Sequence, residues 1–157
     1  MNDNMTEINK ETFWMLIHAA KAECGQDMAT MAEYLKDRLV SMGPGQAQGF
    51  HDILHAYEDL ADKLGLWDAA GVMKESGCSD DGFIDFRAWL IAQGRETYLA
   101  ALADPDSLAE VTPYGDCCFE ELSYVGDRAY EQLTGRSAYD HTDWNKYEML
   151  LTELKQD

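Results

Sequence analysis

The sequence predicts an all-α fold, a single compact domain of about seven to eight helices. Apolar residues recur at helical spacing along almost the whole chain, and no segment alternates between apolar and polar residues as a half-buried strand does. The 157 residues and the hydrophobic fraction of 46% suffice for one core without disulfides. Because neither a linker nor a fixed-period repeat divides the chain, we expect residues 1–157 to form one domain.

The first half of the chain predicts four helices, bounded by capping residues or glycines. Asn9 is the expected N-cap of the first helix, and Gly25 is the expected stop. The second helix begins after Asp27 and ends at the run Gly43-Pro44-Gly45. The expected helices span about residues 11–24, 28–42, 46–64 and 66–75.

The second half predicts four more helices and one short turn. Asp80 is the expected N-cap of the fifth helix, and Asp81 lies in its first turn, where the helix dipole favours a carboxylate. Asp104 can cap the short turn, with Pro105 in its first position. The expected helices span about residues 81–93, 95–103, 119–133 and 143–155, with the turn at 105–109 and a loop at 112–116.

The fifth helix is apolar almost all round, which predicts that it lies buried at the centre of the fold. Within its apolar stretch only Asp85 and Arg87 are polar. A buried guanidinium must find a carboxylate or several carbonyls, because an unpaired buried charge is too costly. The carboxylates that could serve are Asp80, Glu96 and Asp104. Two interpretations of Arg87 stay open, a structural ion pair and an arginine presented to a ligand anion in a cleft.

Three stretches around this helix form a distinctive pattern: residues 77–83 (GCSDDGF), 86–96 (FRAWLIAQGRE) and 103–109 (ADPDSLA). Four shorter stretches accompany them, residues 13–17 (FWMLI), 66–70 (LWDAA), 120–122 (EEL) and 134–136 (TGR). Together they resemble a bacterial family known only as a domain of unknown function, over about residues 9–136. The resemblance implies a small cytosolic protein and supplies no activity. The last helix, about residues 143–155, is then an addition particular to this chain.

The same segment mixes residue types that packing alone would not need, so we expect a ligand or interaction surface there. The polar or polar-tipped candidates are Ser79, Asp80, Asp81, Arg87, Trp89, Gln93, Arg95 and Glu96. Most of them also suit structural roles as helix caps or paired charges. No catalytic residue is assigned, because no recognisable catalytic constellation accompanies them.

Two motifs suggest metal binding. His51, His55 and Glu58 have the spacing of a zinc site on a helix, but the zinc-protease motif needs glutamate where Asp52 stands. We therefore expect an exposed, solvated helix face, with a divalent ion as the alternative. Residues 79–84 imitate the middle of a calcium-binding EF-hand loop but lack both major ligands. The sequence predicts no metal site.

The cysteines match neither zinc knuckles nor a disulfide framework. They are Cys24, Cys78, Cys117 and Cys118. We expect thiols, with a vicinal bridge between the adjacent pair as the alternative. Cys78 precedes the fifth helix, whose dipole can lower a thiol pKa, but Asp80 and Asp81 oppose that effect.

The net charge of −18, from 30 acidic and 12 basic residues, constrains function most strongly. It repels phosphate backbones and anionic membranes, so we expect neither nucleic acid nor a membrane as partner. We predict a non-catalytic, acidic interaction protein that binds a basic protein partner, in its concrete form an immunity or antitoxin-like protein of bacterial conflict. The alternative is an enzyme or a small-molecule-binding protein with a site on the Ser79–Glu96 surface.

The expectations for cofactors and for cellular location rest on motifs that the sequence lacks. No phosphate-binding loop and no dinucleotide fingerprint is present, so no cofactor is expected. The sequence shows neither a signal peptide nor an apolar run of about 18 residues, which predicts a cytoplasmic protein.

Overall fold

The computed structural model describes residues 8–25, 27–74, 78–111 and 117–156, and these contain α-helices and short 3-10 helices but no strand. The α-helices are α1 (Lys10–Cys24), α2 (Met28–Met42), α3 (Pro44–Leu60), α4 (Leu64–Met73), α5 (Asp80–Ala92), α6 (Arg95–Ala103), α7 (Glu120–Thr134) and α8 (Trp144–Leu154). Two 3-10 helices are η2 (Pro105–Glu110) and η3 (Ala138–Asp140). The predicted all-α class and the single compact domain are confirmed.

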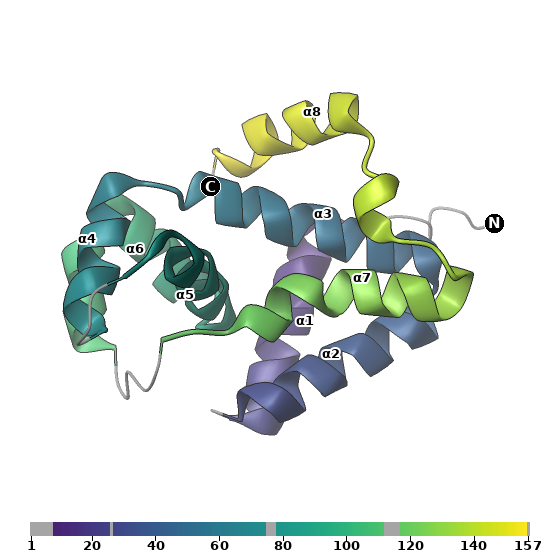
Figure 1. Cartoon of the computed structure of the whole chain (residues 1–157), viewed down its shortest axis with the longest axis horizontal. Coiled ribbons are helices and arrows are strands. Elements are labelled where there is room, and N and C mark those ends of the chain that lie inside the picture. Colours follow the sequence, from purple (N-terminus) through teal and green to yellow (C-terminus); the bar gives the residue numbers. More distant parts are fainter. Residues whose placement is uncertain (1–7, 26, 75–77, 112–116, 157) are drawn as a thin grey trace.

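Helix α3 runs through the middle of the molecule (Figure 1). Helix α7 packs along both α3 and α2, while α8 lies against α3 from another side (Figure 1). Helices α4, α5 and α6 form one end of the molecule, and α5 contacts α3, α4, α6 and α7. The end of α7 nearest this group therefore meets α5.

A cluster of aromatic side chains joins α1, α3 and α6 in the core. Trp14 Nε1 donates a hydrogen bond to Tyr57 Oη at 2.9 Å, and Tyr98 Oη donates to the Tyr57 carbonyl at 2.6 Å. Phe13 and Phe50 pack beside them with ring centroids 4.9 Å apart. All five side chains are buried, so the polar atoms of these rings find their partners inside the core.

Helix α5 confirms the prediction of a central buried helix. Phe83, Phe86 and residues 88–92 are buried, as expected for a helix with neighbours on several sides. Ile84 is the exception among its large apolar side chains, because it lies on the outer face and is 41% exposed. Helix α5 thus anchors the fold while leaving one narrow face at the surface.

The start of α3 differs from the prediction. The helix begins at Pro44 rather than at residue 46, because Gly43 at φ 112° reverses the chain directly after α2. Pro44 then occupies the first helical position, where its missing N–H leaves no hydrogen bond unmade. At its other end α3 stops at Leu60, so that α4 begins at Leu64.

The N-cap of α5 is Ser79 instead of the predicted Asp80. Ser79 Oγ accepts a hydrogen bond from the Gly82 N–H at 3.1 Å, which places Asp80 and Asp81 together in the first turn. The predicted caps Asn9 and Asp104 are confirmed, and α2 begins directly after Asp27 as predicted, with Asp27 as its N-cap. The loop predicted at 112–116 and the predicted end of the fourth helix at residue 75 lie outside the described residues.

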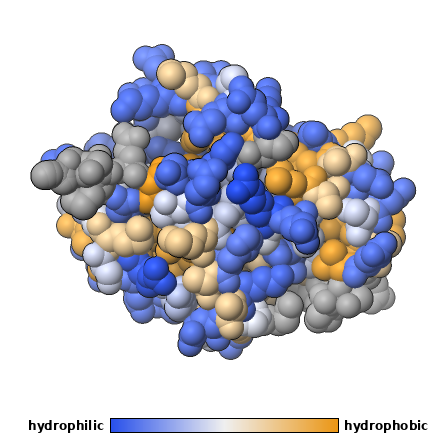
Figure 2. Space-filling view, turned by 180° about the vertical axis from the view of Figure 1, so that it is seen from behind, coloured by the Kyte–Doolittle hydropathy of each residue, from blue (hydrophilic) through white to orange (hydrophobic). Residues whose placement is uncertain are grey.

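The described helices leave a largely polar surface. Seen from behind, the molecule is mainly hydrophilic, and hydrophobic side chains gather toward the end formed by α4, α5 and α6 (Figure 2). Leu64 and Val72 of α4 are 78% and 83% exposed. Within the described ranges, no helix combines the length and the apolar character that crossing a membrane requires.

Candidate functional site

The structure divides the eight predicted site residues among three places along α5. Ser79, Asp80 and Asp81 are exposed at its N-terminal end. Arg87 and Trp89 are buried in its middle. Gln93, Arg95 and Glu96 lie where α5 meets α6. The two ends are about 20 Å apart by helical rise, so the eight side chains do not form one continuous surface.

Arg87 is 9% exposed and is satisfied by carbonyl groups. Its Nη1 donates to the Glu58 carbonyl at 2.7 Å, and its Nε donates to the Phe83 carbonyl at 3.4 Å. The guanidinium also lies over the Phe83 ring, 4.6 Å from its centroid. Among the three carboxylates considered from sequence, none forms an ion pair with Arg87 in the described residues. Arg87 therefore joins α5 to α3.

The junction between α5 and α6 is held by α1. Lys21 Nζ donates to the Gln93 carbonyl at 2.8 Å, and Gln93 Nε2 donates to the Trp89 carbonyl at 3.1 Å. The Arg95 N–H donates to His18 Nε2 at 3.0 Å. These contacts are the kind that fix one helix end against another.

The N-terminal ends of α5 and α7 lie side by side. The Phe119 N–H, just before α7, donates to the Asp85 carbonyl of α5 at 3.0 Å. This contact brings the acidic first turn of α5 close to the acidic first turn of α7. We call the resulting cluster the acidic surface, and its carboxylates are Asp80, Asp81, Asp85, Glu120 and Glu121.

The electrostatics of the acidic surface are read most clearly at Asp85. Burial raises the pKa of this carboxyl, and the nearby charges of Glu120, Asp81 and Glu121 raise it further. Lys74 acts in the opposite direction and lowers the pKa of Asp85, but its ammonium donates to Cys118 Sγ at 2.8 Å. The carboxylates at this end therefore repel one another more than the local cation compensates.

Sequence reasoning identified Asp80 and Asp81 but missed the contribution of α7. Glu120 and Glu121 directly follow Cys118 and Phe119 and begin a helix, so they repeat the acidic helix start of α5. That repetition is a signal in the sequence. The sequence does not show that the two helix starts are neighbours, because no local pattern reports their distance in the fold.

Most of the polar side of α3 is enclosed, contrary to the prediction of an exposed, solvated face, although His55 is only half-buried. His51 and Glu58 are only 3% and 5% exposed. Helix α7 covers them at Gly126, where an added Cβ would lie 2.7 Å from His51 Cβ. The absence of a side chain at this position lets the two helices approach closely enough to enclose the polar residues.

Glu58 and His55 take part in a polar network with α7 and η3, in which Glu58 is buried and His55 is half-buried. Ser123 Oγ donates to Glu58 Oε2 at 2.7 Å, and His55 Nε2 lies 3.9 Å from Glu58 Oε1. The other ring nitrogen of His55 bonds the His51 carbonyl at 2.9 Å, and Tyr139 contacts both histidine rings. Burial raises the pKa of Glu58 and lowers that of His51 to about 3.

No metal geometry arises from this network. Across the described residues, no three His, Cys, Asp or Glu side chains stand where they could jointly hold a metal ion. Within the same residues, His51 Nδ1 is buried without a hydrogen-bond partner. The imidazole is therefore packed as a neutral ring, which agrees with its lowered pKa.

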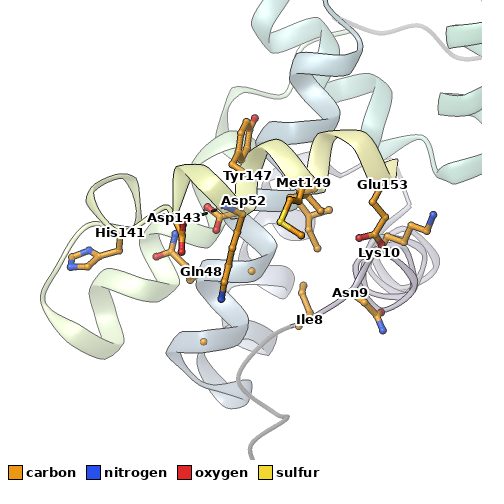
Figure 3. A pocket seen from close by; sticks show the side chains of 15 residues that line it. Ile8, Asn9, Lys10, Gln48, Asp52, His141, Asp143, Tyr147, Met149 and Glu153 are labelled. Atoms are coloured by element: carbon orange, nitrogen blue, oxygen red, sulfur yellow. Dashed lines mark hydrogen bonds between the residues drawn. The ribbon is translucent and has the colours of Figure 1, made fainter. Parts of the chain in front are cut away.

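A groove of about 570 Å³ lies beneath α8, between this helix, α3 and the start of α1 (Figure 3). Lys10 and Glu153 lie at one end of the groove and His141 at the other (Figure 3). Asp52 Oδ1 accepts from Gln48 Nε2 at 3.1 Å and from Thr142 Oγ1 at 2.8 Å, so these side chains tie the segment before α8 to α3. Tyr147 Oη of α8 also donates to Asp59 Oδ2.

Comparison with known proteins places the chain in a family. No curated protein and no solved structure matches it. Residues 8–132 match the family described as "Protein of unknown function (DUF4240)". The matched region ends within α7, so η3 and α8 lie beyond it. The chain belongs to this family.

Proposed function

We propose that this member of the DUF4240 family is a non-catalytic, acidic protein that binds a basic protein partner through the acidic surface at the starts of α5 and α7. The observation that carries the proposal is the convergence of two acidic helix starts, joined by the hydrogen bond from the Phe119 N–H to the Asp85 carbonyl. We place this binding in the cytoplasm. The net charge of −18 favours the encounter with a basic protein.

Structural stabilisation alone accounts for part of this acidity. Carboxylates in the first turn of a helix interact favourably with its dipole, which explains Asp81 and Glu120 considered separately. It does not explain why two such turns lie together, because each then raises the energy of the other's charges. The pKa of Asp85 is raised chiefly by burial, and the charges of Glu120, Asp81 and Glu121 add to the increase. A basic partner would relieve the repulsion among these charges, and the net charge would speed the encounter.

Two exposed apolar or aromatic side chains lie on the same two helices as these carboxylates. Ile84 precedes Asp85 on α5 and is 41% exposed. Tyr124 lies one turn after Glu120 and Glu121 on α7 and is 44% exposed. An apolar or aromatic contact surrounded by charged residues is the usual composition of a specific protein interface. We therefore propose Ile84 and Tyr124 as the anchors and the carboxylates as the rim.

In its concrete form, the partner we propose is a basic toxin of bacterial conflict, with this protein as an immunity or antitoxin-like neutraliser. An acidic face can cover a basic cleft that would otherwise bind a polyanion, which needs no catalytic group in the neutraliser. The alternative of a small-molecule site on the Ser79–Glu96 surface requires an arginine open to a ligand. The engagement of Arg87 with two carbonyls favours the interaction proposal.

Paired charge variants test the proposal. Glu120→Gln/Glu121→Gln removes two charges from the acidic surface, and Glu131→Gln/Glu148→Gln removes two charges from exposed positions elsewhere on α7 and α8. Binding of a fluorescent oligolysine peptide is measured by anisotropy at low and moderate salt. We expect the first variant to bind about tenfold more weakly than the wild type, and the second to bind nearly as well.

Equal weakening by both double variants would contradict the proposal, because only the net charge would then matter. The same three proteins serve as bait in affinity capture from the native host. We expect one partner to be retained by the wild type and by Glu131→Gln/Glu148→Gln and lost with Glu120→Gln/Glu121→Gln. Failure to recover any specific partner at either salt concentration would also count against the proposal.

A further inference from the structure

Two cysteines and a lysine from three separate segments meet beside the N-terminal end of α5. Lys74 directly follows α4, Cys78 precedes α5, and Cys118 precedes α7. Lys74 Nζ donates a hydrogen bond to Cys118 Sγ at 2.8 Å. None of the four cysteines, all of which the structure describes, is in a disulfide. An ammonium in direct contact with a sulfur can stabilise the negative charge that develops on that sulfur when it reacts.

Gly82 leaves the room that this cluster needs. A Cβ at position 82 would lie 3.1 Å from Lys74 Nζ and 3.6 Å from Cys78 Sγ. The lysine ammonium and the Cys78 thiol thus approach the same point of the α5 backbone, while the ammonium also contacts Cys118. Both thiols are half-buried, so small reagents can reach them.

The two thiols differ in their surroundings. Burial raises the pKa of Cys78; Lys74 lowers it, whereas Cys118 and Asp85 raise it further. Cys78 is therefore held as the neutral thiol. Cys118 has the direct hydrogen bond from the ammonium and directly follows Cys117, a buried residue at φ 53°. A residue other than glycine at such a φ is strained by about 1 kcal/mol or more, as is common beside functional groups.

We propose that Cys118 is a covalent modification site for hydroperoxides and that Cys78 is its resolving thiol. The Cys118 thiolate attacks one peroxide oxygen, an S–O bond forms, and the O–O bond breaks. The departing oxygen takes a proton from water, which leaves a sulfenic acid on Cys118. The Cys78 sulfur then attacks the Cys118 sulfur, the S–O bond breaks, and the hydroxide leaves as water with the Cys78 proton. Two thiols are oxidised to one disulfide, and the peroxide is reduced.

Oxidation of the reduced full-length protein with stoichiometric hydrogen peroxide tests this site, with peptide mapping by mass spectrometry as the readout. Cys24 serves as the internal reference, because it is half-buried and lies beside Glu23 and Asp27. We expect a Cys78–Cys118 disulfide to form before Cys24 is oxidised. In Cys78→Ser, we expect dimedone to trap a sulfenic acid on Cys118.

The role of the lysine is tested by alkylation with iodoacetamide, which measures thiolate reactivity without an oxidant. We expect Lys74→Met to slow the labelling of Cys118 relative to Cys24 by about tenfold, and Lys74→Arg to preserve most of the rate. Equal labelling of Cys24 and Cys118 in the wild type would overturn the proposal even if the lysine variants failed to fold. A link between Cys117 and Cys118 would overturn the assignment of Cys78.

Discussion

At the scale of single residues, the charged groups buried between α3, α5 and α7 decide how the molecule is held together. Arg87 reaches the Glu58 carbonyl, and the Glu58 side chain accepts from Ser123. These bonds give the buried guanidinium and the buried carboxyl of Glu58 partners inside the fold. The need of Arg87 for several carbonyls was one of the expectations from sequence, whereas the identity of its partner was not. Glu58 lies 29 residues earlier in the chain, and no local pattern connects the two.

Arg87→Met tests whether this arginine is structural. The substitution keeps the apolar stem but removes the guanidinium donors to the Glu58 and Phe83 carbonyls, and the Glu58 carbonyl keeps only the Ala61 N–H at 3.2 Å. We therefore expect the free energy of unfolding to fall by about 2–4 kcal/mol. Urea denaturation measures the change, and oligolysine binding by the folded variant should match that of the wild type. An unchanged stability with lost binding would show instead that Arg87 belongs to a binding site.

His51 makes the stability depend on pH with a predictable sign. Its pKa is lowered by burial from 6.5 to about 3, so between these values the unfolded chain binds a proton that the folded protein does not. Stability from this group is therefore complete above about pH 6.5 and is lost as the pH falls toward 3, by up to about 1.4 kcal/mol per pH unit. His51→Leu should remove this component.

Urea denaturation at a series of pH values compares the wild type with His51→Leu. The difference between their free energies of unfolding isolates His51 from the carboxyls, such as Glu58, whose raised pKa has the opposite effect on acidification. Parallel curves for the two proteins between pH 4 and 6.5 would show that His51 is accessible to protons in the folded state.

At the scale of elements, the close approach of α3 and α7 is the contact that the sequence could not reveal. Helix positions followed from apolar periodicity and from caps such as Asn9 and Asp27, because both signals are local. The polar stripe of His51 and Glu58 was misread as solvated, because burial depends on which helix covers it. Helix α7 covers this stripe at Gly126. A glycine within a helix does not indicate which other helix will pack against it.

Gly126→Ala tests this contact against a matched control. The new Cβ would lie 2.7 Å from His51 Cβ and 2.9 Å from backbone atoms of the same residue, so the two helices must separate. We expect a loss of about 1–3 kcal/mol in the free energy of unfolding. Gly71→Ala in α4 meets nothing within 4 Å, and we expect it to stabilise by about 0.5–1 kcal/mol. Thermal denaturation of both variants measures the contrast, and equal effects would contradict this packing.

At the scale of the whole molecule, one compact helical domain carries a charge that is far from balanced. The class and the charge could be read from the sequence, and so could the membership of a family of unknown function. The arrangement of that charge could not be read from the sequence, because the starts of α5 and α7 become neighbours only when the chain folds. Asp81 and Glu120 lie almost forty positions apart in the chain, yet both raise the pKa of Asp85.

The most direct test of the central proposal is a residue-resolved titration of the isotope-labelled protein with an oligolysine peptide, followed by nuclear magnetic resonance at a moderate ionic strength of about 0.15 M. We predict that the amide shifts concentrate at the starts of α5 and α7, including Ile84 and Tyr124, and that Glu120→Gln/Glu121→Gln abolishes this pattern. Shifts spread evenly over the acidic residues of all helices would contradict the proposal, because the charge would then act without a site.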